Sequence, residues 1–440
     1  ARTFADARHY REAYHQAIVA IGQWAGDRPL PDRAGISVKL SALHPRYEAT
    51  AHAQVMKELC PILLDLAREA KAYDLNFTVD AEEADRLELS LDMIGAVFAD
   101  PSLAGWDGFG LAIQAYQKRA LGVIDWCDDL AKGLDRRMMV RLVKGAYWDS
   151  EIKRAQERGL ADYPVFTRKA MTDLSYQACA RRLLAARPRL YPQFATHNAL
   201  TVATILVEAK GNSGFEFQRL HGMGDTLYRH LLKTYPDLAC RTYAPVGGHR
   251  ELLAYLVRRL LENGANSSFV SVAADPQVPI KNLLQRPAAL IGSAGAARHR
   301  HLPLPHALYG AARVNSHGVE FGHEASLQAL LAELRQGAAQ GPFTAMSLIN
   351  GKEQTGAVHA VVSPQQTAHT VGAVHEAGPA HAAKAMEAAQ AGYRAWQSVS
   401  VGERAAALRQ AANRLEAERG LFLHLLQQEA GKTLDDALAE

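Results

Sequence analysis

The feature that most constrains the fold is an alternation of short apolar runs with longer amphipathic stretches between residues 35 and 272. This alternation is typical of repeated βα units around a parallel sheet. The predicted strands are Ile36–Leu40, Asn76–Asp80, Gly108–Gln114, Met138–Lys144, Gln193–His197, Phe215–Leu220, Cys240–Tyr243 and Ser267–Val272. Several of these runs are apolar on successive residues, as expected of strands covered on both faces. Eight units favour an α/β fold with a closed (β/α)8 barrel of the TIM type over an open sheet.

Polar residues stand at the ends of many of the predicted strands. Lys39, Asp80 and Gln114 close the first three strands, and Thr196 and His197 close the fifth. In barrel enzymes, side chains at the carboxyl ends of the strands form the active site. We therefore expect the active site at that end of the barrel.

The βα pattern ends near residue 295, where small residues and prolines take over. Since single cores usually stop growing at ~250–300 residues, a chain of 440 residues is expected to hold a second domain. We predict a barrel domain over residues 1–295, a linker over 296–340 and an incomplete, mostly helical domain over 341–440. An extended segment there leads to helices at Pro379–Trp396 and Gly402–Leu438. The start at Ala1, without an initiator Met or signal peptide, is expected of a piece of a longer protein.

Composition and spacing argue against several other classes of protein. The chain has no apolar run near the ~20 residues that a membrane span needs. Its net charge of +3 is spread over short, scattered basic clusters, so a nucleic-acid-binding stripe is not predicted. The cysteines lie far apart and read as reduced thiols of a cytosolic protein; they are Cys60, Cys127, Cys179 and Cys240. His299, His301 and His306 lie in a Pro-rich stretch without helical spacing, and we predict no metal site.

The segment His249–Gly264 after the seventh strand is predicted to be a helix with a chemically distinctive face. Tyr255, Arg258, Arg259 and Glu262 fall at i, i+3, i+4 and i+7, so they share one side. Two guanidinium groups there form a clamp suited to a carboxylate. The alternative is a solvated outer face on which Arg258 pairs with Glu262.

The end of the fourth strand has the residue types that a flavin needs. Arg141 supplies a cation, Gly145 lets the backbone approach a ligand closely, and Tyr147 and Trp148 follow as large aromatics. The alternative is that both aromatics are core or rim residues. No Gly-x-Gly-x-x-Gly follows a strand, so a dinucleotide would be held without a Rossmann fingerprint.

Several of these motifs together resemble a known family. They are Ile36–Tyr47 (ISVKLSALHPRY), Val79–Arg86 (VDAEEADR), Gly110–Gln117 (GLAIQAYQ), Val140–Trp148 (VRLVKGAYW), Phe194–Asn198 (FATHN), Phe215–Gly224 (FEFQRLHGMG) and Tyr243–Phe269. In this order they look like the proline dehydrogenase domain of the proline utilization A family, bifunctional bacterial proteins with a second, Δ1-pyrroline-5-carboxylate dehydrogenase activity. The resemblance spans roughly residues 1–295.

The resemblance implies an FAD-dependent barrel enzyme. Hydride would pass from C5 of L-proline to flavin N5, giving Δ1-pyrroline-5-carboxylate in the first step of proline catabolism to glutamate. The electrons would go to a membrane quinone. It also implies a cytoplasmic protein, with peripheral contact at the inner face of the plasma membrane and self-association as open alternatives.

The resemblance also assigns roles to individual residues. Lys39, Arg258 and Arg259 would bind the proline carboxylate, and Asp80 would pair with one of these cations. Leu220, Tyr243 and Tyr255 would press the pyrrolidine ring against the flavin. The positions implied for FAD are Gln114, Arg141, Val143, Lys144, Gly145, Ala146, Trp148, Thr167, Lys169, Thr196, His197, Asn198, Gln218, Glu262 and Ser268.

Residues 391–433 resemble the amino-terminal helices of aldehyde dehydrogenases. The catalytic cysteine of that family is not reached, so NAD-dependent oxidation of glutamate semialdehyde is expected to be absent from this chain. Two other functions remain open: a non-catalytic docking piece of a larger enzyme, and a barrel hydrolase or aldolase. The first would need no polar strand ends, and the second would need a Schiff-base lysine or metal ligands inside the barrel.

Overall fold

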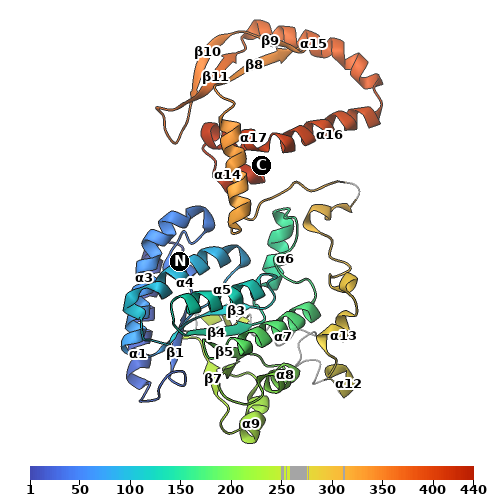
Figure 1. Cartoon of the computed structure of the whole chain (residues 1–440). Coiled ribbons are helices and arrows are strands. Elements are labelled where there is room, and N and C mark those ends of the chain that lie inside the picture. The colour runs from blue at the N-terminus through green and yellow to red at the C-terminus, as the bar shows by residue number, and fades with distance from the viewer. Residues whose placement is uncertain (249–251, 254, 258–274, 276, 311–312) are drawn as a thin grey trace. The chain divides into compact units, whose positions relative to one another are not determined.

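The computed structural model describes residues 1–248, 252–253, 255–257, 275, 277–310 and 313–440 (Figure 1). These residues belong to two compact units. The first comprises Ala1–Glu157 and Asp162–Leu304, and the second comprises Arg158–Ala161 and Pro305–Glu440.

A seven-stranded parallel sheet forms the centre of the first unit, with its strands side by side in chain order. The strands are β1 (Gly35–Val38), β2 (Asn76–Val79), β3 (Phe109–Gln114), β4 (Met138–Val143), β5 (Leu190–Ala195), β6 (Glu216–Leu220) and β7 (Cys240–Tyr243). The prediction of a parallel barrel sheet is confirmed for these strands. The predicted eighth strand, Ser267–Val272, lies outside the described residues.

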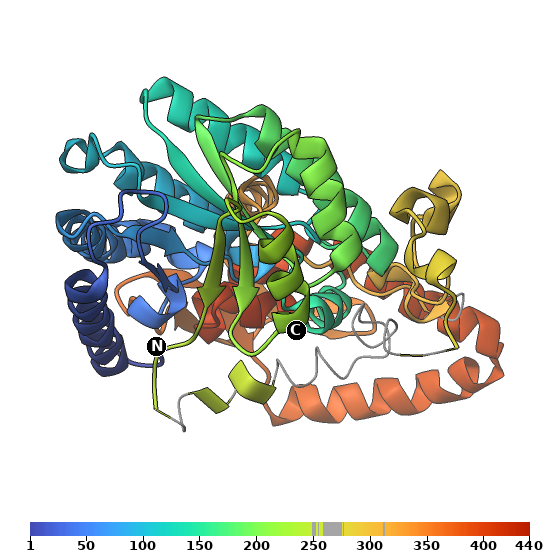
Figure 2. The ribbon, with the colours of Figure 1, turned by 90° about the horizontal axis from the view of Figure 1, so that it is seen from below.

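Helices connect successive strands and pack around the sheet (Figures 1 and 2). The longer ones are α1 (Phe4–Trp24), α3 (His52–Ala72), α4 (Leu87–Ala99), α5 (Ala120–Gly133), α6 (Trp148–Glu157), α7 (Lys169–Ala185), α8 (Ala199–Ala209) and α9 (Asp225–Thr234). Short helical turns are α2 (Leu40–Leu43), η1 (Ala49–Ala51), η2 (Ala84–Arg86), η3 (Pro101–Leu103), α12 (Ile280–Leu283), α13 (Pro287–Ile291) and η4 (Ala294–Ala296).

The sheet is curled, so side chains on its inner face meet across it. Arg141 in β4 donates from Nη2 to Ser37 Oγ in β1 at 2.8 Å. Arg241 in β7 donates from Nη1 to the carbonyl oxygen of Arg33, just before β1, at 2.7 Å. The described strands therefore form a curved wall whose two edges approach each other (Figure 2).

The hydrophobic core lies between the outer face of this wall and the helices. Leu59 and Leu63 of α3 are fully buried there, and so are Phe77 and Phe109, whose rings stack at 5.9 Å between centroids. All residues of β2 and β3 are buried because both faces of these strands are covered. Apolar burial of this extent supplies the main favourable term in folding.

The four free cysteines lie on different elements of this unit. Cys127 in α5 and Cys179 in α7 are buried, while Cys60 in α3 and Cys240 in β7 are half-buried. Burial raises the pKa of the Cys60, Cys179 and Cys240 thiols to about 11 and raises that of Cys127 as well. All four thiols are therefore protonated at neutral pH.

The second unit combines a four-stranded sheet with helices. Its strands lie in the order β10-β11-β8-β9, and only the β11 and β8 pair is parallel among those described. Leu330 and Leu334 of α14 pack with Leu423 of α17 in a small core. The elements are η5 (Pro305–Ala307), α14 (Glu324–Ala338), β8 (Phe343–Ile349), β9 (Lys352–Gln354), β10 (Ala357–Val362), β11 (Thr370–Glu376), α15 (Pro379–Ser398), α16 (Val401–Ala417), α17 (Arg419–Ala430) and α18 (Leu434–Ala439).

The single helix predicted over residues 402–438 is wrong, because the chain forms α16, α17 and α18 there. The break between α17 and α18 falls at Gly431, whose φ of +67° is left-handed and ends a helix. Every residue of α15 and α16 is described, and none is buried. Apolar side chains such as Trp396 and Leu408 are therefore exposed on these two helices.

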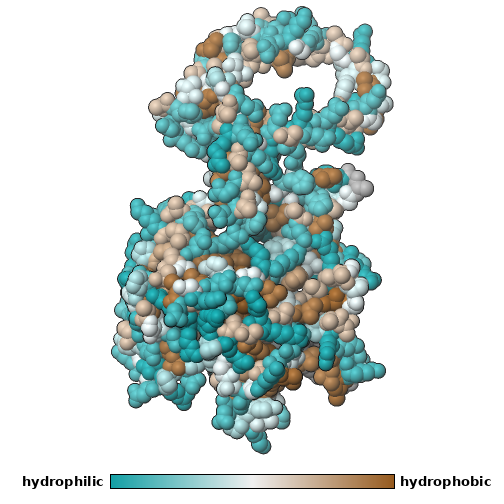
Figure 3. Space-filling model, viewed as in Figure 1, coloured by the Kyte–Doolittle hydropathy of each residue, from teal (hydrophilic) through white to brown (hydrophobic). Residues whose placement is uncertain are grey.

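None of the helices in the described part of the chain is both long and apolar enough to cross a membrane. The space-filling view accordingly shows hydrophobic side chains scattered among hydrophilic ones on the visible face (Figure 3).

Candidate active site

The parallel sheet brings the predicted strand-end residues to one edge. Lys39 and Asp80 directly follow β1 and β2, and Gln114 and Val143 are the last residues of β3 and β4. Thr196 follows β5, and the last residues of β6 and β7 are Leu220 and Tyr243. The carboxyl ends of parallel strands meet at one end of a barrel, so these side chains share one region.

Asp80 is the centre of a charged cluster in this region. Its Oδ1 lies 2.9 Å from Arg141 Nη1, and its Oδ2 lies 3.2 Å from Lys39 Nζ. The hydroxyl of Tyr243 donates to Oδ2 at 3.5 Å, and the Arg141 guanidinium lies over the Tyr243 ring at 4.9 Å. Asp80 was predicted to pair with Lys39, Arg258 or Arg259, and it does contact Lys39, whose role in binding a carboxylate stays a prediction. Its shorter contact with Arg141 was not predicted.

The electrostatics of this cluster keep Lys39 charged and Tyr243 neutral. Burial opposes the ammonium of Lys39, but Asp80 together with smaller contributions from Tyr147, Glu82 and Tyr243 outweighs it and raises the pKa of Lys39. Burial, reinforced by Asp80, raises the pKa of Tyr243 to about 12. Two cations around one carboxylate leave an excess of positive charge, which suits an anionic ligand.

Tyr255 is the part of the predicted carboxylate clamp that the structure describes. It is half-buried, residues 255–257 are helical, and Tyr255 adds to the raised pKa of Tyr243, so the two phenols lie near each other. Arg258, Arg259, Glu262 and Ser268 lie outside the described residues.

The turn after β4 places two lysines around one carboxylate. Lys144 pairs with Asp173 Oδ1, and Lys169 Nζ lies 2.8 Å from Asp173 Oδ2. Burial lowers the pKa of Lys144 despite this partner. Burial would raise the pKa of Asp173, but the two ammonium groups outweigh it and lower that pKa.

Gly145, next along this turn, has a φ of +136° that side chains rarely adopt. A Cβ there would also lie 2.4 Å from the ring of Tyr116. Ala146 completes the turn before Trp148, whose Nε1 donates to the carbonyl oxygen of Phe166 at 2.9 Å and whose side chain is partly exposed. The backbone of this turn is therefore held in one conformation with an aromatic ring at its edge.

Most of the other positions implied for the cofactor make local hydrogen bonds. Thr196 Oγ1 accepts from the Asn198 backbone at 3.2 Å, and Asn198 Oδ1 caps α8 by accepting from Thr201 N at 3.1 Å. His197 Nε2 accepts from Leu220 N at 3.1 Å, which joins the ends of β5 and β6.

Two further positions implied for the cofactor, Thr167 and Gln114, are buried. Thr167 Oγ1 accepts from His299 N at 3.0 Å, and Gln114 Oε1 accepts from Gln117 Nε2 at 2.8 Å. These contacts fix the two side chains against neighbouring loops.

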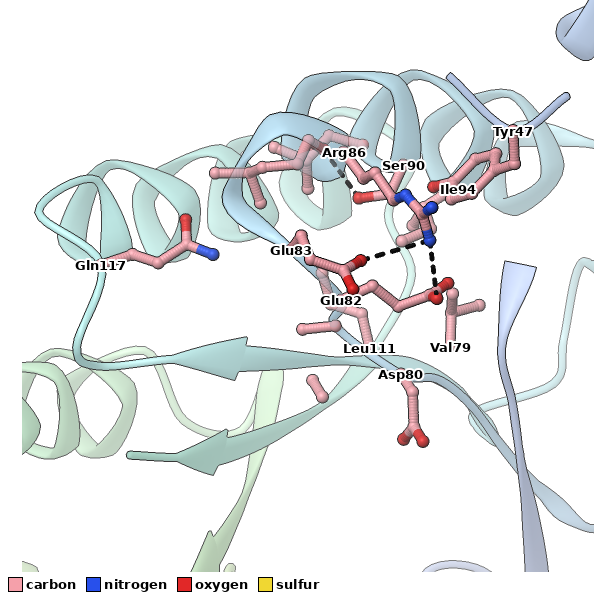
Figure 4. A pocket seen from close by; sticks show the side chains of 14 residues that line it. Tyr47, Val79, Asp80, Glu82, Glu83, Arg86, Ser90, Ile94, Leu111 and Gln117 are labelled. Carbon is pink, nitrogen blue, oxygen red and sulfur yellow. Dashed lines mark hydrogen bonds and ion pairs between the residues drawn. The ribbon is translucent and has the colours of Figure 1, made fainter. Parts of the chain in front are cut away.

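The acidic residues of the motif after β2 belong to two different clusters. Arg86 Nη1 lies 3.2 Å from both Glu82 Oε2 and Glu83 Oε2, beside a small cavity next to α4. In Figure 4, Asp80 points away from these groups. Glu82 and Glu83 therefore hold the turn, while Asp80 alone of the three joins the charged cluster at the strand ends.

Sequence reasoning missed four residues that shape this region. Tyr14 accepts a hydrogen bond from Lys39 N at 3.0 Å, and Asp173 joins the two lysines. The buried Glu216 forms an ion pair with the partly buried Arg241 inside the curled sheet. Glu216 alone had a readable signal, because polar Glu216 and Gln218 alternate with Phe215 and Phe217.

Among the residues that the structure describes, no group of three His, Cys, Asp or Glu side chains is able to hold a metal ion.

Comparisons with known proteins agree with the sequence resemblance. A family model for proline dehydrogenase matches residues 1–272, and one for the aldehyde dehydrogenase family matches residues 351–440. The bifunctional protein PutA of Escherichia coli (strain K12) is 46% identical over 454 residues, which cover 100% of this chain and 34% of that protein. The bifunctional protein PutA of Rhizobium meliloti is 46% identical over 450 residues, covering 100% of this chain and 36% of that protein.

Solved structures show the same likeness. A crystal structure of a variant of Bradyrhizobium japonicum proline utilization A is 61% identical, with a TM-score of 0.88, and covers 100% of this chain and 41% of that one. Proline utilization A from Bdellovibrio bacteriovorus, inactivated by N-propargylglycine, is 28% identical with a TM-score of 0.87, covering 99% and 46%. The chain spans about a third of the length of the curated relatives it matches. The match of the family model to residues 1–272 shows that the chain belongs to the proline dehydrogenase family.

Proposed function

We propose that this chain catalyses the FAD-dependent oxidation of L-proline to Δ1-pyrroline-5-carboxylate, the first step of proline catabolism to glutamate. The observation that carries the proposal is the cluster in which Asp80 binds both Lys39 and Arg141 at the carboxyl end of the barrel. It places an ammonium suited to the substrate carboxylate next to a guanidinium suited to a redox cofactor. Family membership supports the same reaction.

The chemistry of the described donors fits an FAD. Its pyrophosphate is anionic, and Lys144 and Lys169 supply two ammonium groups beside the turn at Gly145. Trp148 offers a partly exposed aromatic face, and Thr196 and Gln218 supply polar groups at the ends of β5 and β6.

In the proposed mechanism, the protein binds and orients proline. Lys39, charged at neutral pH because its pKa is raised, binds the carboxylate, while Asp80 fixes the position of this ammonium. Tyr243 stays a neutral phenol and packs with Leu220 and Tyr255 against the pyrrolidine ring, which excludes water. FAD, when bound, supplies N5 as the acceptor of the hydride from proline C5.

Two arginines complete this proposal from the segment outside the described residues. Arg258 and Arg259 would clamp the carboxylate together with Lys39, as the family resemblance implies. Substituting Arg258→Met should raise the KM for proline strongly and leave flavin content nearly unchanged, because losing one partner of a buried charged hydrogen bond costs about 2–5 kcal/mol. Loss of flavin with an unaltered KM would contradict this assignment.

Partners, location and domain borders belong to the same proposal. The electrons pass to a membrane quinone, and the protein acts in the cytoplasm, with peripheral contact at the plasma membrane and self-association as open alternatives. Residues 1–295, 296–340 and 341–440 are the barrel, the linker and part of an aldehyde dehydrogenase-like domain. The family match to residues 351–440 supports the last of these.

An anaerobic titration of the purified protein with L-proline tests the function. We expect a yellow protein whose flavin absorbance bleaches on adding L-proline, with formation of Δ1-pyrroline-5-carboxylate. D-Proline at the same concentration is the control and should bleach it far more slowly. A colourless protein with flavin absent after reconstitution would favour a docking role, and a coloured protein that L-proline does not reduce would exclude this substrate.

A further inference from the structure

A column of polar side chains runs along the inner face of the curled sheet, below the candidate active site. Its lower end is the ion pair between Glu216 in β6 and Arg241 in β7, with Nε to Oε1 at 2.8 Å and Nη2 to Oε2 at 3.0 Å. The Glu216 residue is 1% exposed, so its carboxylate lies out of water. An ion pair that takes a carboxylate out of water rarely adds stability over apolar residues of the same volume, so stability alone does not account for it.

Glu216 binds more than Arg241. Its Oε1 also accepts from Gln218 Nε2 at 2.7 Å and from Gln193 Nε2 at 3.0 Å. All four hydrogen bonds end on a carboxylate whose ionic partner is Arg241. An ionised carboxylate can only accept, so the amide nitrogen of Gln218 has to face it.

The direction of its amide nitrogen determines which atom of Gln218 faces Arg141. With Nε2 directed to Glu216, the oxygen Oε1 faces upward and accepts from Arg141 Nε at 2.8 Å. If the amide were flipped, its nitrogen would face Arg141 Nε, and both groups are donors. Glu216 therefore selects the one amide orientation that can bind the guanidinium.

Arg141 is held in one plane by three different partners. Its Nε donates to Gln218, its Nη1 to Asp80 at 2.9 Å and its Nη2 to Ser37 at 2.8 Å. Asp80 and Ser37 hold the far end of the guanidinium, while Gln218 holds Nε. Losing the contact at Nε would leave the group free to rotate about the other two.

We propose that Glu216 is a positioning residue for the redox reaction: it orients the Gln218 amide, which in turn fixes the Arg141 guanidinium beside the flavin. This inference rests on the proposed function, because the flavin gives the orientation of Arg141 its consequence. A guanidinium fixed before the reaction stabilises the negative charge that reduction adds, without a cost of reorganisation at that moment.

The test removes the acceptor of Gln218 without leaving a buried charge. In the double variant Glu216→Met with Arg241→Met, both charges leave together and the side-chain volumes stay similar. Glu216→Met alone is a second variant, in which Arg241 keeps its hydrogen bonds to the carbonyl oxygens of Pro31 and Arg33, at 2.6 and 2.7 Å. Gln193→Met is the matched control, since it removes another buried donor to the same carboxylate oxygen but leaves Gln218 in place.

The first measurement is a crystal structure of each variant that folds. We expect the distance from Arg141 Nε to Gln218 Oε1 to exceed hydrogen-bonding range, above about 3.5 Å, in the Glu216 variants but not in Gln193→Met. An unchanged contact with the same guanidinium plane in a Glu216 variant would overturn the proposal. This measurement decides the positioning role whether or not the protein oxidises proline.

The second measurement is the reaction itself, by stopped-flow reduction and by flavin redox titration. In the Glu216 variants, the limiting rate of reduction by proline should fall about tenfold, as expected on losing one hydrogen bond to a charged group. The KM for proline should change less than about twofold, because the contacts of Lys39 remain. The midpoint potential of the bound flavin should become more negative, because a rotating guanidinium stabilises the reduced form less.

The two proposals fail in different ways. If the wild-type protein binds flavin but L-proline does not reduce it, the proposed function fails, and the crystal structures and the flavin potential still decide the role of Glu216. If the wild type reacts but the Glu216 variants match Gln193→Met in rate and potential, the positioning role fails and the proposed function stands.

Discussion

Replacing Asp80 by Asn removes the charge on which the candidate active site is organised. The substitution keeps the volume of the side chain and leaves one oxygen that can still accept from Arg141. It takes the negative charge away from two cations, of which Arg141 is nearly buried, with 10% of its side chain exposed. Lys39 is more accessible, with 39% exposed.

The size of the effect follows from these exposures. Breaking a buried pair by removing one partner costs about 3–5 kcal/mol, whereas a solvent-exposed pair is worth about 1 kcal/mol or less. The oxygen that Asn retains offsets part of the first cost. We therefore expect Asp80→Asn to lower the free energy of unfolding of the first unit by about 2–4 kcal/mol at pH 7.

Urea unfolding followed by tryptophan fluorescence measures this difference. A Trp396→Phe background confines the signal to the first unit, because the other four tryptophans all lie in it. Asp162→Asn is the matched control: Asp162 also binds two cations, Lys118 at 2.7 Å and Arg298 at 2.6 Å, but 47% of its side chain is exposed. The control should lose about 1 kcal/mol or less.

Asp80→Asn should also change how ligand binding depends on pH. In the wild type, Asp80 is the largest of the charges that together outweigh the burial of Lys39, so the pKa of Lys39 is raised. Without Asp80, burial dominates and the pKa of Lys39 should fall. As the pH is raised, the affinity for an anionic proline analogue should therefore begin to fall at a lower pH in Asp80→Asn than in the wild type. Equal stability losses in Asp80→Asn and Asp162→Asn, with the same pH profile as the wild type, would refute this account.

Three further predictions concern other parts of the chain. Gly145→Ala should lower both the melting temperature and the flavin content, measured by calorimetry and absorbance, because its φ of +136° and the nearby Tyr116 ring oppose a Cβ; an unchanged variant would contradict this. Asp173→Asn should destabilise the protein by about 2–4 kcal/mol at pH 7. Because the folded pKa of Asp173 is lowered, the difference in unfolding free energy should persist above the ordinary aspartate pKa of about 3.9 and shrink as the pH falls through the folded value; a difference that grows in acid would show the reverse linkage. Trypsin should cut α15 and α16 before the barrel, as followed by mass spectrometry, because neither helix buries a side chain and isolated helices are marginally stable; first cleavage within the barrel helices would count against this.

The parallel sheet was predictable because each strand carries its own local signal. Short runs of apolar and β-branched residues bounded by turn residues indicate β1–β7, and the spacing between these runs leaves room for helices. The start of β5 was misplaced, since the strand begins at Leu190 and not after Pro192. Proline reads as a strand breaker because it lacks an N–H group, yet Pro192 pairs in register with Val140.

The candidate site was predictable in its residues and much less in its contacts. Lys39, Asp80 and Arg141 stand out as charged groups near strand ends, but pairing of Asp80 with Arg141 depends on the curl of the sheet, which no local pattern encodes. The same is true of Glu216 and Arg241. The alternation around Glu216 indicates that it shares a face of its strand with Gln218, but no local pattern indicates that Arg241 lies opposite it.

The four cysteines can report local opening of the first unit, because they lie on different elements of it. Their thiols sit on α3, α5, α7 and β7, spread along the chain, and react with aromatic disulfide reagents only as thiolates. Burial raises every one of their pKa values, and labelling of the buried Cys127 and Cys179 has to wait for a local opening event, whereas Cys60 and Cys240 are half-buried. Pulsed alkylation followed by peptide mass spectrometry would thus rank the elements that carry the cysteines by their free energy of opening. Cys127 and Cys179 should be labelled last, and no engineered cysteine is needed.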